Sequence, residues 1–313
     1  MSTVNTHQEI NRLQNTARSL DLLKAADVAH QRAQRAEVAR AAAVAVLAAL
    51  AVLSSFKPEI ADVIAIIGVA ASVGTEVIWP WFSRQNTTTA MLLQEMFDTE
   101  LFALPWNTHL GDKVSGPQIE RLKAVYHRGE EAKRDWYVDV SGLSRADAVM
   151  VCQRQNLLWD SELRLAWAGR VVGLAVLWLV AGVAVALIDD WTTRQFFVRW
   201  LAPSLPLILF VGVHAFGHWK IATDKDATRR ELDHILDTRA SRALSSNRHS
   251  ELMHKARARQ DKIADQRRHT ERVPRWFYTR RQPRDQVGHD EDAARIRERL
   301  LGLGSPQDAG GNA

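Results

Sequence analysis

The chain has 313 residues, of which 46% are hydrophobic and 25% are charged, with a formal net charge of +5. Its mean hydropathy of −0.22 is that of an ordinary soluble protein, but the apolar residues are concentrated in two zones, 36–82 and 166–218. This distribution excludes a uniformly soluble globular protein and indicates a membrane protein with soluble parts. The one cysteine, Cys152, excludes a disulfide framework within the chain and suits a reducing cytoplasm. Residues 1–35 are polar, so we expect no cleaved signal peptide.

The N-terminal part is predicted to be a cytoplasmic helical segment, 1–38, followed by a transmembrane hairpin, 39–82. A spanning helix needs about 20 mostly apolar residues. Residues 39–56 and 60–82 form two such runs, separated only by three residues. The first run is short and rich in alanine, so a soluble core helix is the alternative for it. Its pairing with the second run favours a tight hairpin.

Glu76 is the one carboxylate well inside any of the predicted spans. Ionisable groups within a bilayer are costly and invite a functional interpretation. Glu76 lies near the inner end of its span, where partial snorkelling is within reach. Lining an aqueous path, or bonding to another helix, would explain it, and Glu76 is our candidate pore-lining residue. Gly68 and Ser72 in the same span are small enough to permit close helix packing.

Residues 83–165 are predicted to form a cytoplasmic helical region. A helix continues from the second span through 89–104, where apolar residues repeat at helical spacing, and Pro105 ends it. A second helix is predicted over 117–129, with proline in its first turn and glycine after its end. A third begins at Ser144, in a capping-box-like start, and continues without a break into the third span.

One face of this third helix carries a polar row at steps of three and four residues. The row consists of Gln153, Asn156, Asp160 and Arg164. Amide, carboxylate and guanidinium groups in such a row can bind a polar ligand, and with the adjacent Arg154 they are our ligand-sensing candidates. In the alternative interpretation, Asp160 and Arg164 simply pair with each other.

The second predicted hairpin occupies 166–219, with spans at 166–188 and 198–219 joined by a polar segment. Gly169 and Gly173 form a small-xxx-small pattern that permits close helix packing. His214 and His218 stand one turn apart at the inner end of the fourth span, but two histidines make a poor metal site. We therefore expect them at the membrane interface, with no metal bound.

Residues 220–303 are predicted to be a cytoplasmic, basic helical region, followed by a disordered tail at 304–313. An intermittent apolar stripe after the fourth span would pack against the central helices or another copy of the chain. An aromatic segment, 273–278, interrupts the basic tract 255–284. Its Arg275 and Trp276 are candidates for binding nucleotide phosphate and base, or anionic lipid headgroups. An ordered surface turn near the membrane is the alternative.

The flanking charges predict the orientation of the spans, because basic residues are retained on the cytoplasmic side. The hairpin tips carry few basic residues, namely Lys57, Arg194 and Arg199. The other flanks carry more, including Arg32, Arg35, Arg40, Arg84, Arg164, Arg170, Lys220, Lys225, Arg229 and Arg230. Both termini and the central segment are therefore expected in the cytoplasm.

The sequence carries none of the common motifs for catalysis or cofactor binding. The sequence has no phosphate loop, no dinucleotide-binding glycine pattern, no nucleophile elbow and no cysteine pair for zinc. We therefore expect no enzymatic activity and no cofactor.

Several stretches resemble the SMODS-associating four-transmembrane effector family of bacterial conflict systems. They are Gln94-Glu95-Met96-Phe97-Asp98, Leu104-Pro105-Trp106-Asn107, Asp135-Trp136-Tyr137, Cys152-Gln153-Arg154-Gln155-Asn156, Trp159-Asp160, Leu163-Arg164 and the aromatic segment. Arg275 stands where the family often has an acidic residue. The resemblance covers essentially the whole chain and implies a membrane effector, thought to form pores, encoded beside a nucleotide second-messenger synthetase in anti-phage defence. It carries over no catalytic residues.

The sequence thus predicts an all-α, polytopic membrane protein with four transmembrane helices in two hairpins and cytoplasmic helical regions. The first functional hypothesis is a pore-forming or membrane-disrupting effector in the bacterial inner membrane. Its expected partners are the lipid bilayer, further copies of the chain in a homo-oligomer, and a cyclic oligonucleotide from a partner nucleotidyltransferase, with no DNA or RNA polymer. The alternative is a non-conducting scaffold or sensor that recruits a cytoplasmic protein.

Overall fold

The computed structural model describes residues 9–240, 246–268 and 273–302. Every regular element among these residues is helical. The predicted tail at 304–313 lies outside the described residues. Four helices are long and apolar enough to cross a membrane, which confirms the predicted all-α fold with four spans. The alanine-rich first run is one of the four, so a soluble core helix is not needed to explain it.

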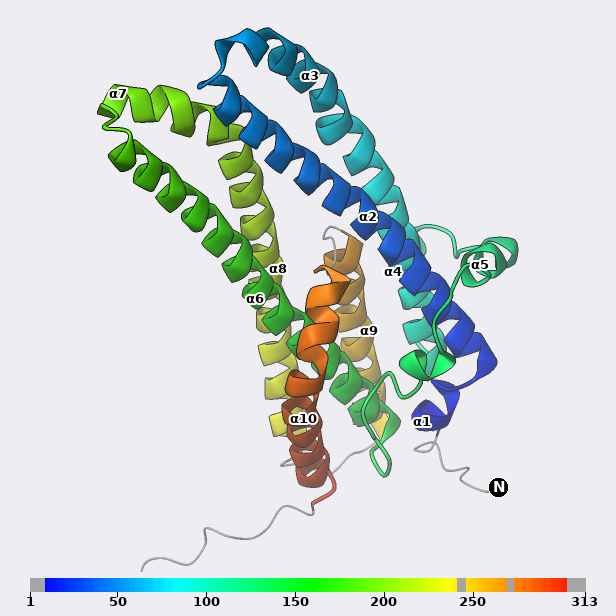
Figure 1. Ribbon diagram of the computed structural model, residues 1–313. Helices are drawn as coiled ribbons and strands as arrows, with labels where there is room; N and C mark the ends of the chain where they lie inside the picture. Colours follow the sequence, from blue (N-terminus) through cyan, green and yellow to red (C-terminus); the bar gives the residue numbers. More distant parts are fainter. Residues whose placement is uncertain (1–8, 241–245, 269–272, 303–313) are drawn as a thin grey trace, which may run out of the picture.

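The four long helices form two hairpins that rise from a shared helical base (Figure 1). In the first hairpin, α2 (Ala17–Ser54) packs along α3 (Ala61–Val73) and α4 (Trp79–Phe102). In the second, α6 (Arg145–Ile188) packs along α8 (Ala202–Ala240), with the short α7 (Thr193–Phe196) at the tip. At that tip a capping box between Thr192 and Gln195 satisfies backbone N–H groups where the chain reverses.

Two π-turns interrupt the spans, one in each hairpin. Gly74–Ile78 lies between α3 and α4, and Phe197–Leu201 lies between α7 and α8. Such single π-turns widen a helix locally and occur often at functional sites. The first contains Glu76, so the candidate pore-lining carboxylate stands on a locally irregular helix.

Gly182 allows the two helices of the second hairpin to approach each other closely. A Cβ built there would lie 2.3 Å from Nε1 of Trp200, which is buried and packs against Trp178 with 4.9 Å between ring centroids and 32° between the ring planes. We expect Gly182→Ala to lower the free energy of unfolding by about 1–3 kcal/mol, because the packed indole must shift. Thermal unfolding in detergent measures the effect. Gly173→Ala is the control, since a Cβ at Gly173 meets nothing within 4 Å. Equal stability of the two variants would contradict the assignment.

The soluble base contains one hydrophobic core, formed by both ends of the chain and its centre. It combines the N-terminal halves of α2 and α6 with α1 (Glu9–Leu13), α5 (Gly116–Lys123), α9 (Ser246–Arg268), α10 (Arg275–Leu300) and the ends of α4 and α8. Leu232 and Leu236 of α8 are buried in it. The apolar stripe after the fourth span therefore packs within this chain.

The predicted helix boundaries in the central region hold with one correction. The second span continues into α4, which ends where Ala103 adopts a left-handed conformation with φ 49°, two residues before Pro105. α6 runs unbroken from the base into the third span, as predicted. The helix predicted over 117–129 is shorter, because after Lys123 the N–H groups of Val125 and Tyr126 bond to carbonyls three residues back and tighten the last turn.

Candidate functional site at the base of the hairpins

A cavity of about 900 Å³ separates the two hairpins. It is walled by α2, α3 with its π-turn, and α8, mostly through apolar side chains. Its polar lining includes Arg40, Ser72, Thr75, Glu76, His214 and His218. The two hairpins therefore do not form a closely packed four-helix bundle. They enclose a largely apolar cavity that contains a few charged groups.

Arg40 connects both hairpins at this cavity. Its Nη2 lies 3.3 Å from Oε2 of Glu76, and its Nη1 lies 3.7 Å from Oε2 of Glu37. Its guanidinium also stands 5.0 Å from the ring centroid of Phe210 on α8. The Glu76 side chain is 63% exposed despite the ion pair. The cluster of two carboxylates and one guanidinium therefore leaves a net negative charge beside the cavity.

Glu37 and the two histidines extend this polar group toward the soluble base. Glu37 is 8% exposed, and neither of its carboxylate oxygens has a hydrogen-bond partner among the described residues. Nε1 of Trp167 is 3.3 Å from Nε2 of His214, whose ring lies 4.7 Å from that of His218. Within the described parts of the chain, no group of three or more potential metal ligands occurs.

A buried charge cluster anchors the third and fourth spans to each other just below the membrane segment. Oδ2 of Asp160 lies 2.8 Å from Nε of Arg164 and 3.1 Å from Nζ of Lys225. Burial acts to raise the pKa of Asp160, but the two cations outweigh it and hold that pKa well below its usual range. Burial lowers the pKa of Lys225 to about 8, against the opposing attraction of Asp160. The pairing of Asp160 with Arg164, left open by the sequence, is present.

The remaining polar residues of this face connect α6 to three other helices. Gln153 donates from Nε2 to the carbonyl of Ala256 at 2.9 Å and to Gln260 at 3.0 Å. Arg154 forms ion pairs with Asp233 of α8 and Asp292 of α10, and Asn156 contacts Tyr137 at 3.4 Å. All of the ligand-sensing candidates on α6 therefore have partners within the chain. Their role in sensing stays a prediction.

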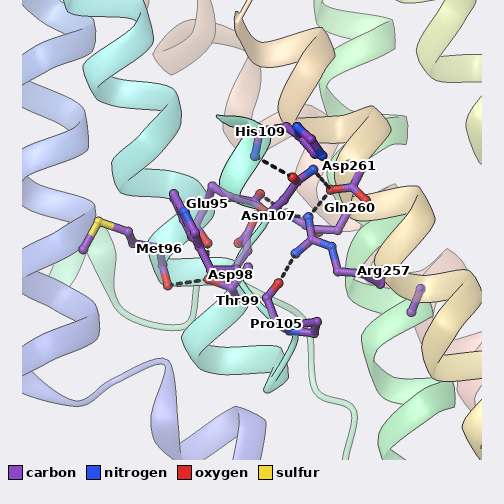
Figure 2. A network of polar contacts seen from close by, with 12 residues as sticks. Glu95, Met96, Asp98, Thr99, Pro105, Asn107, His109, Arg257, Gln260 and Asp261 are labelled. Carbon is purple, nitrogen blue, oxygen red and sulfur yellow. Dashed lines mark hydrogen bonds and ion pairs between the residues drawn. The ribbon is translucent and has the colours of Figure 1, made fainter. Parts of the chain in front are cut away.

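A second buried network was not selected from the sequence, although its acidic residues belong to the stretch that resembles the effector family. Figure 2 shows Glu95 and Asp98 of α4 facing Arg257 and Gln260 of α9. Glu95 is fully buried and accepts hydrogen bonds from Arg257 at 2.9 Å and Gln260 at 2.7 Å. Asp98 accepts from Arg267 at 2.6 Å. The sequence did contain a sign of this network. Glu95 and Asp98 lie three residues apart on a helix with many apolar residues, and buried carboxylates need partners.

Burial of Glu95, reinforced by the charge of Asp98, raises the pKa of Glu95 from 4.5 to about 7. The folded state therefore binds the Glu95 proton more tightly than the unfolded state does. Protonation of Glu95 stabilises the fold fully below pH 4.5, and this stabilisation is lost as the pH rises to about 7. We expect the free energy of unfolding to fall by about 3 kcal/mol across this range. Thermal unfolding between pH 5 and 7.5 measures the slope, which Glu95→Gln should remove. An unchanged slope in the variant would contradict this assignment.

The aromatic segment contacts both hairpins at once. Val273 and Phe277 are buried against Leu163 of α6. On the other side, Gln34 of α2 donates to the carbonyl of Val273 at 2.8 Å and accepts from the N–H of Arg275 at 3.2 Å. The segment is the start of α10, so it is more than the surface turn considered as the alternative.

Arg275 and Trp276 are directed to different surroundings. Nη1 of Arg275 is 2.8 Å from Oδ2 of Asp27, so Arg275 is paired within the chain, with a carboxylate that Lys133 also approaches at 3.4 Å. Trp276 is 55% exposed and meets Trp167 edge-on at 5.8 Å between ring centroids. The structure therefore does not bring the two side chains to one partner, and their role in binding stays a prediction.

The predicted helix-packing residues have no close neighbours within the described chain. A Cβ built at Gly68, Gly169 or Gly173 meets nothing within 4 Å. Gly68 and Ser72 line the cavity, and Ser72 donates to the carbonyl of Gly68 at 2.8 Å. Packing through these residues would thus involve another copy of the chain and stays a prediction. Among the described glycines, Gly182 has the closest approach to a neighbouring helix, and it lies outside the small-xxx-small pattern of Gly169 and Gly173.

These features define a four-span helical membrane protein whose soluble helices are joined to the spans by buried ion pairs and by the aromatic segment. The family model described as the SMODS-associating 4TM effector domain matches residues 8–296, and the chain belongs to this family. It is also 24% identical, over 210 residues, to a Bacillus cereus (strain VD146) protein named a probable CBASS effector molecule. That match covers 66% of this chain and 68% of the relative. No solved structure matches the chain.

Proposed function

We propose that this chain is a membrane-disrupting effector of a nucleotide second-messenger (CBASS) anti-phage defence system and that it conducts ions when activated. Family membership and the name of the Bacillus relative support the effector role. In this proposal the protein is non-enzymatic and lies in the bacterial inner membrane with both termini cytoplasmic. Four helices are too few to enclose a wide channel, so the active form is a homo-oligomer, with contacts through Gly169 and Gly173.

The observation that carries the conduction proposal is the position of Glu76. Its carboxylate lies in a spanning segment, lines the cavity between the hairpins and is 63% exposed. A carboxylate facing lipid would be costly, whereas one facing water within a path is stabilised and attracts cations. Its partner Arg40 joins α2 to the π-turn within the first hairpin and reaches Phe210 of α8 in the second. Separation of the hairpins would therefore remove the contact with Phe210 and open the cavity beside the Arg40–Glu76 pair.

The aromatic segment and the Asp160 cluster supply a route by which a cytoplasmic signal reaches the spans. A cyclic oligonucleotide can shift the hairpins only by binding one arrangement better than the other. Three of the candidates bond to other parts of the chain. Gln153 bonds to α9, Arg154 bonds to α8 and α10, and Asn156 bonds to Tyr137. A messenger that competes for these groups would loosen the contacts that hold the base together, so recognition and transmission would use the same face.

Glu76→Gln is the direct test of the conduction proposal. We expect cation over anion preference to fall about tenfold, because about 1.4 kcal/mol of electrostatic attraction is removed while Arg40 stays at the cavity. The measurement is ion flux and reversal potential of purified protein in liposomes, with and without cyclic dinucleotides. Glu59→Gln, at the exposed hairpin tip, is the matched control.

Unchanged selectivity in Glu76→Gln would remove Glu76 from the conduction path. Absence of flux from the wild type under every messenger condition, with the protein correctly inserted, would favour the non-conducting scaffold or sensor. Gly173→Leu separates assembly from conduction, since a bulky side chain there should block packing between copies without meeting any neighbour in the chain.

A further inference from the structure

A cationic and aromatic cluster surrounds the point where α10 meets the third span. The guanidinium of Arg170 stands 4.9 Å from the ring centroid of Phe277, and that of Arg281 stands 6.0 Å from it. Trp276 and Arg280 follow each other by one helical turn and are both exposed. The start of α10 therefore presents an indole and guanidinium groups on one surface.

The contacts of this cluster place it at the level where the third span leaves the bilayer. Trp167 and Arg170 belong to the first turns of that span, and they touch Trp276 and Phe277 respectively. An indole is favoured at this depth because its ring can be buried while its N–H meets water. Arg170 can extend its charged group from the span toward the headgroups.

Two cations of the cluster, Arg170 and Arg280, are not paired with a carboxylate in the part of the chain that the structure describes. Among the described residues, neither Arg170 nor Arg280 has an ion pair or a hydrogen bond, in contrast to Arg275, which pairs with Asp27. Further exposed cations occupy the same ends of the spanning helices, namely Arg32, Arg35, Arg84 and Lys220. The positive charge of this surface is complementary to a layer of negative lipid headgroups. The surface also lies at the end of the third span, at the expected level of the headgroups.

We propose that Arg170, Trp276 and Arg280 form a binding site for the phosphate headgroup of an anionic phospholipid in the adjoining leaflet. The two guanidinium groups bind the phosphate, and the Trp276 ring lies at the boundary between headgroup and acyl chain. Because the aromatic segment also bonds to Gln34 of α2, a bound lipid would hold the start of α10 against both hairpins. The site does not depend on ion conduction.

Native mass spectrometry of the full chain in detergent tests the site with phosphatidylglycerol and phosphatidylcholine of identical acyl chains. We expect tighter binding of phosphatidylglycerol, and a loss of about fivefold per cation, hence about 25-fold in Arg170→Gln with Arg280→Gln. Phosphatidylcholine binding should be unchanged. The matched control is Arg12→Gln with Arg121→Gln, which removes two exposed charges from α1 and α5 in the base.

Equal phosphatidylglycerol affinity in the double variant and the wild type would overturn the site. Displacement of the lipid by a cyclic dinucleotide, but not by inorganic phosphate at the same concentration, would reassign the cluster to a soluble messenger and overturn it as well.

A second measurement leaves the site residues intact. Thr279→Cys carries a fluorophore beside the site, and the native Cys152 is fully buried and does not compete for the label. Headgroup spin-labelled lipids in liposomes should quench this fluorophore and spare one at Arg121→Cys. Equal quenching at the two positions would also overturn the proposal.

Discussion

Asp160→Ala is expected to lower the free energy of unfolding by about 3–5 kcal/mol, because it removes the carboxylate that two buried cations share. Arg164 and Lys225 are 2% and 1% exposed, and both lie against the same carboxylate oxygen of Asp160. Thermal and denaturant unfolding in detergent measure the loss. Glu162→Ala is the control, since its side chain is 50% exposed and its pairing with His289 should contribute at most about 1 kcal/mol.

The same variant should respond to pH in a defined direction. Its folded state favours neutral Lys225, whose pKa is already lowered to about 8 in the wild type. A lysine with a lowered folded pKa gains stability as the pH rises toward its unfolded value of 10.5. Raising the pH from 7 to 9 should therefore recover part of the loss in Asp160→Ala. A loss no larger than that of Glu162→Ala, with no recovery at pH 9, would contradict the assignment of Asp160 as the shared counter-ion.

Arg267→Met is expected to have a comparable effect on the soluble base, about 3–5 kcal/mol. Arg267 donates to Asp98 at 2.6 Å, and Asp98 is 1% exposed beside the fully buried Glu95. Without the guanidinium, two carboxylates face each other in the core, so the loss should shrink at pH 5, where protonation relieves their repulsion. Unfolding of the purified protein at pH 5 and pH 7.5 measures both quantities.

Arg268→Met is the matched control for this variant. Arg268 is the next residue on α9 and bonds only to the carbonyl of Leu110 among the contacts described. Its loss should cost about 1 kcal/mol and should not depend on pH. Equal effects at the two positions would show that the buried carboxylates do not rely on Arg267.

The Asp160 cluster and the Glu95 network divide the stability of the molecule between two places. The first joins α6 to α8 beside the membrane, and the second joins α4 to α9 in the base. Gln153 of α6 connects these regions, because it donates to Gln260 of α9, which in turn donates to Glu95. Variants in the Asp160 cluster should weaken the contact between α6 and α8. Variants in the Glu95 network should weaken the attachment of α9 to α4. This difference allows assembly of the spans to be examined separately from folding of the base.

The sequence by itself determined the spans and the continuity of the helices. Apolar length is sufficient for this, because a bilayer requires about 20 apolar residues whatever surrounds them. The passage of α4 and α6 from span to base followed from their uninterrupted helical pattern, and the end of α4 followed from Pro105. The family resemblance rested on stretches that lie outside the predicted spans and was confirmed by the family match.

Tertiary structure alone decided what the polar residues contact. The row on α6 could have faced a ligand or other helices, and only the packing of α8, α9 and α10 shows that Gln153 and Arg154 have partners there. Likewise Arg275 and Trp276 are adjacent in sequence but contact Asp27 and Trp167 respectively. Helical periodicity determines which side chains share a face, whereas their partners lie more than 70 positions away in the chain for Arg154 and more than 240 for Arg275. Contacts at such separations arise from the way the hairpins and the base assemble, which no local pattern specifies.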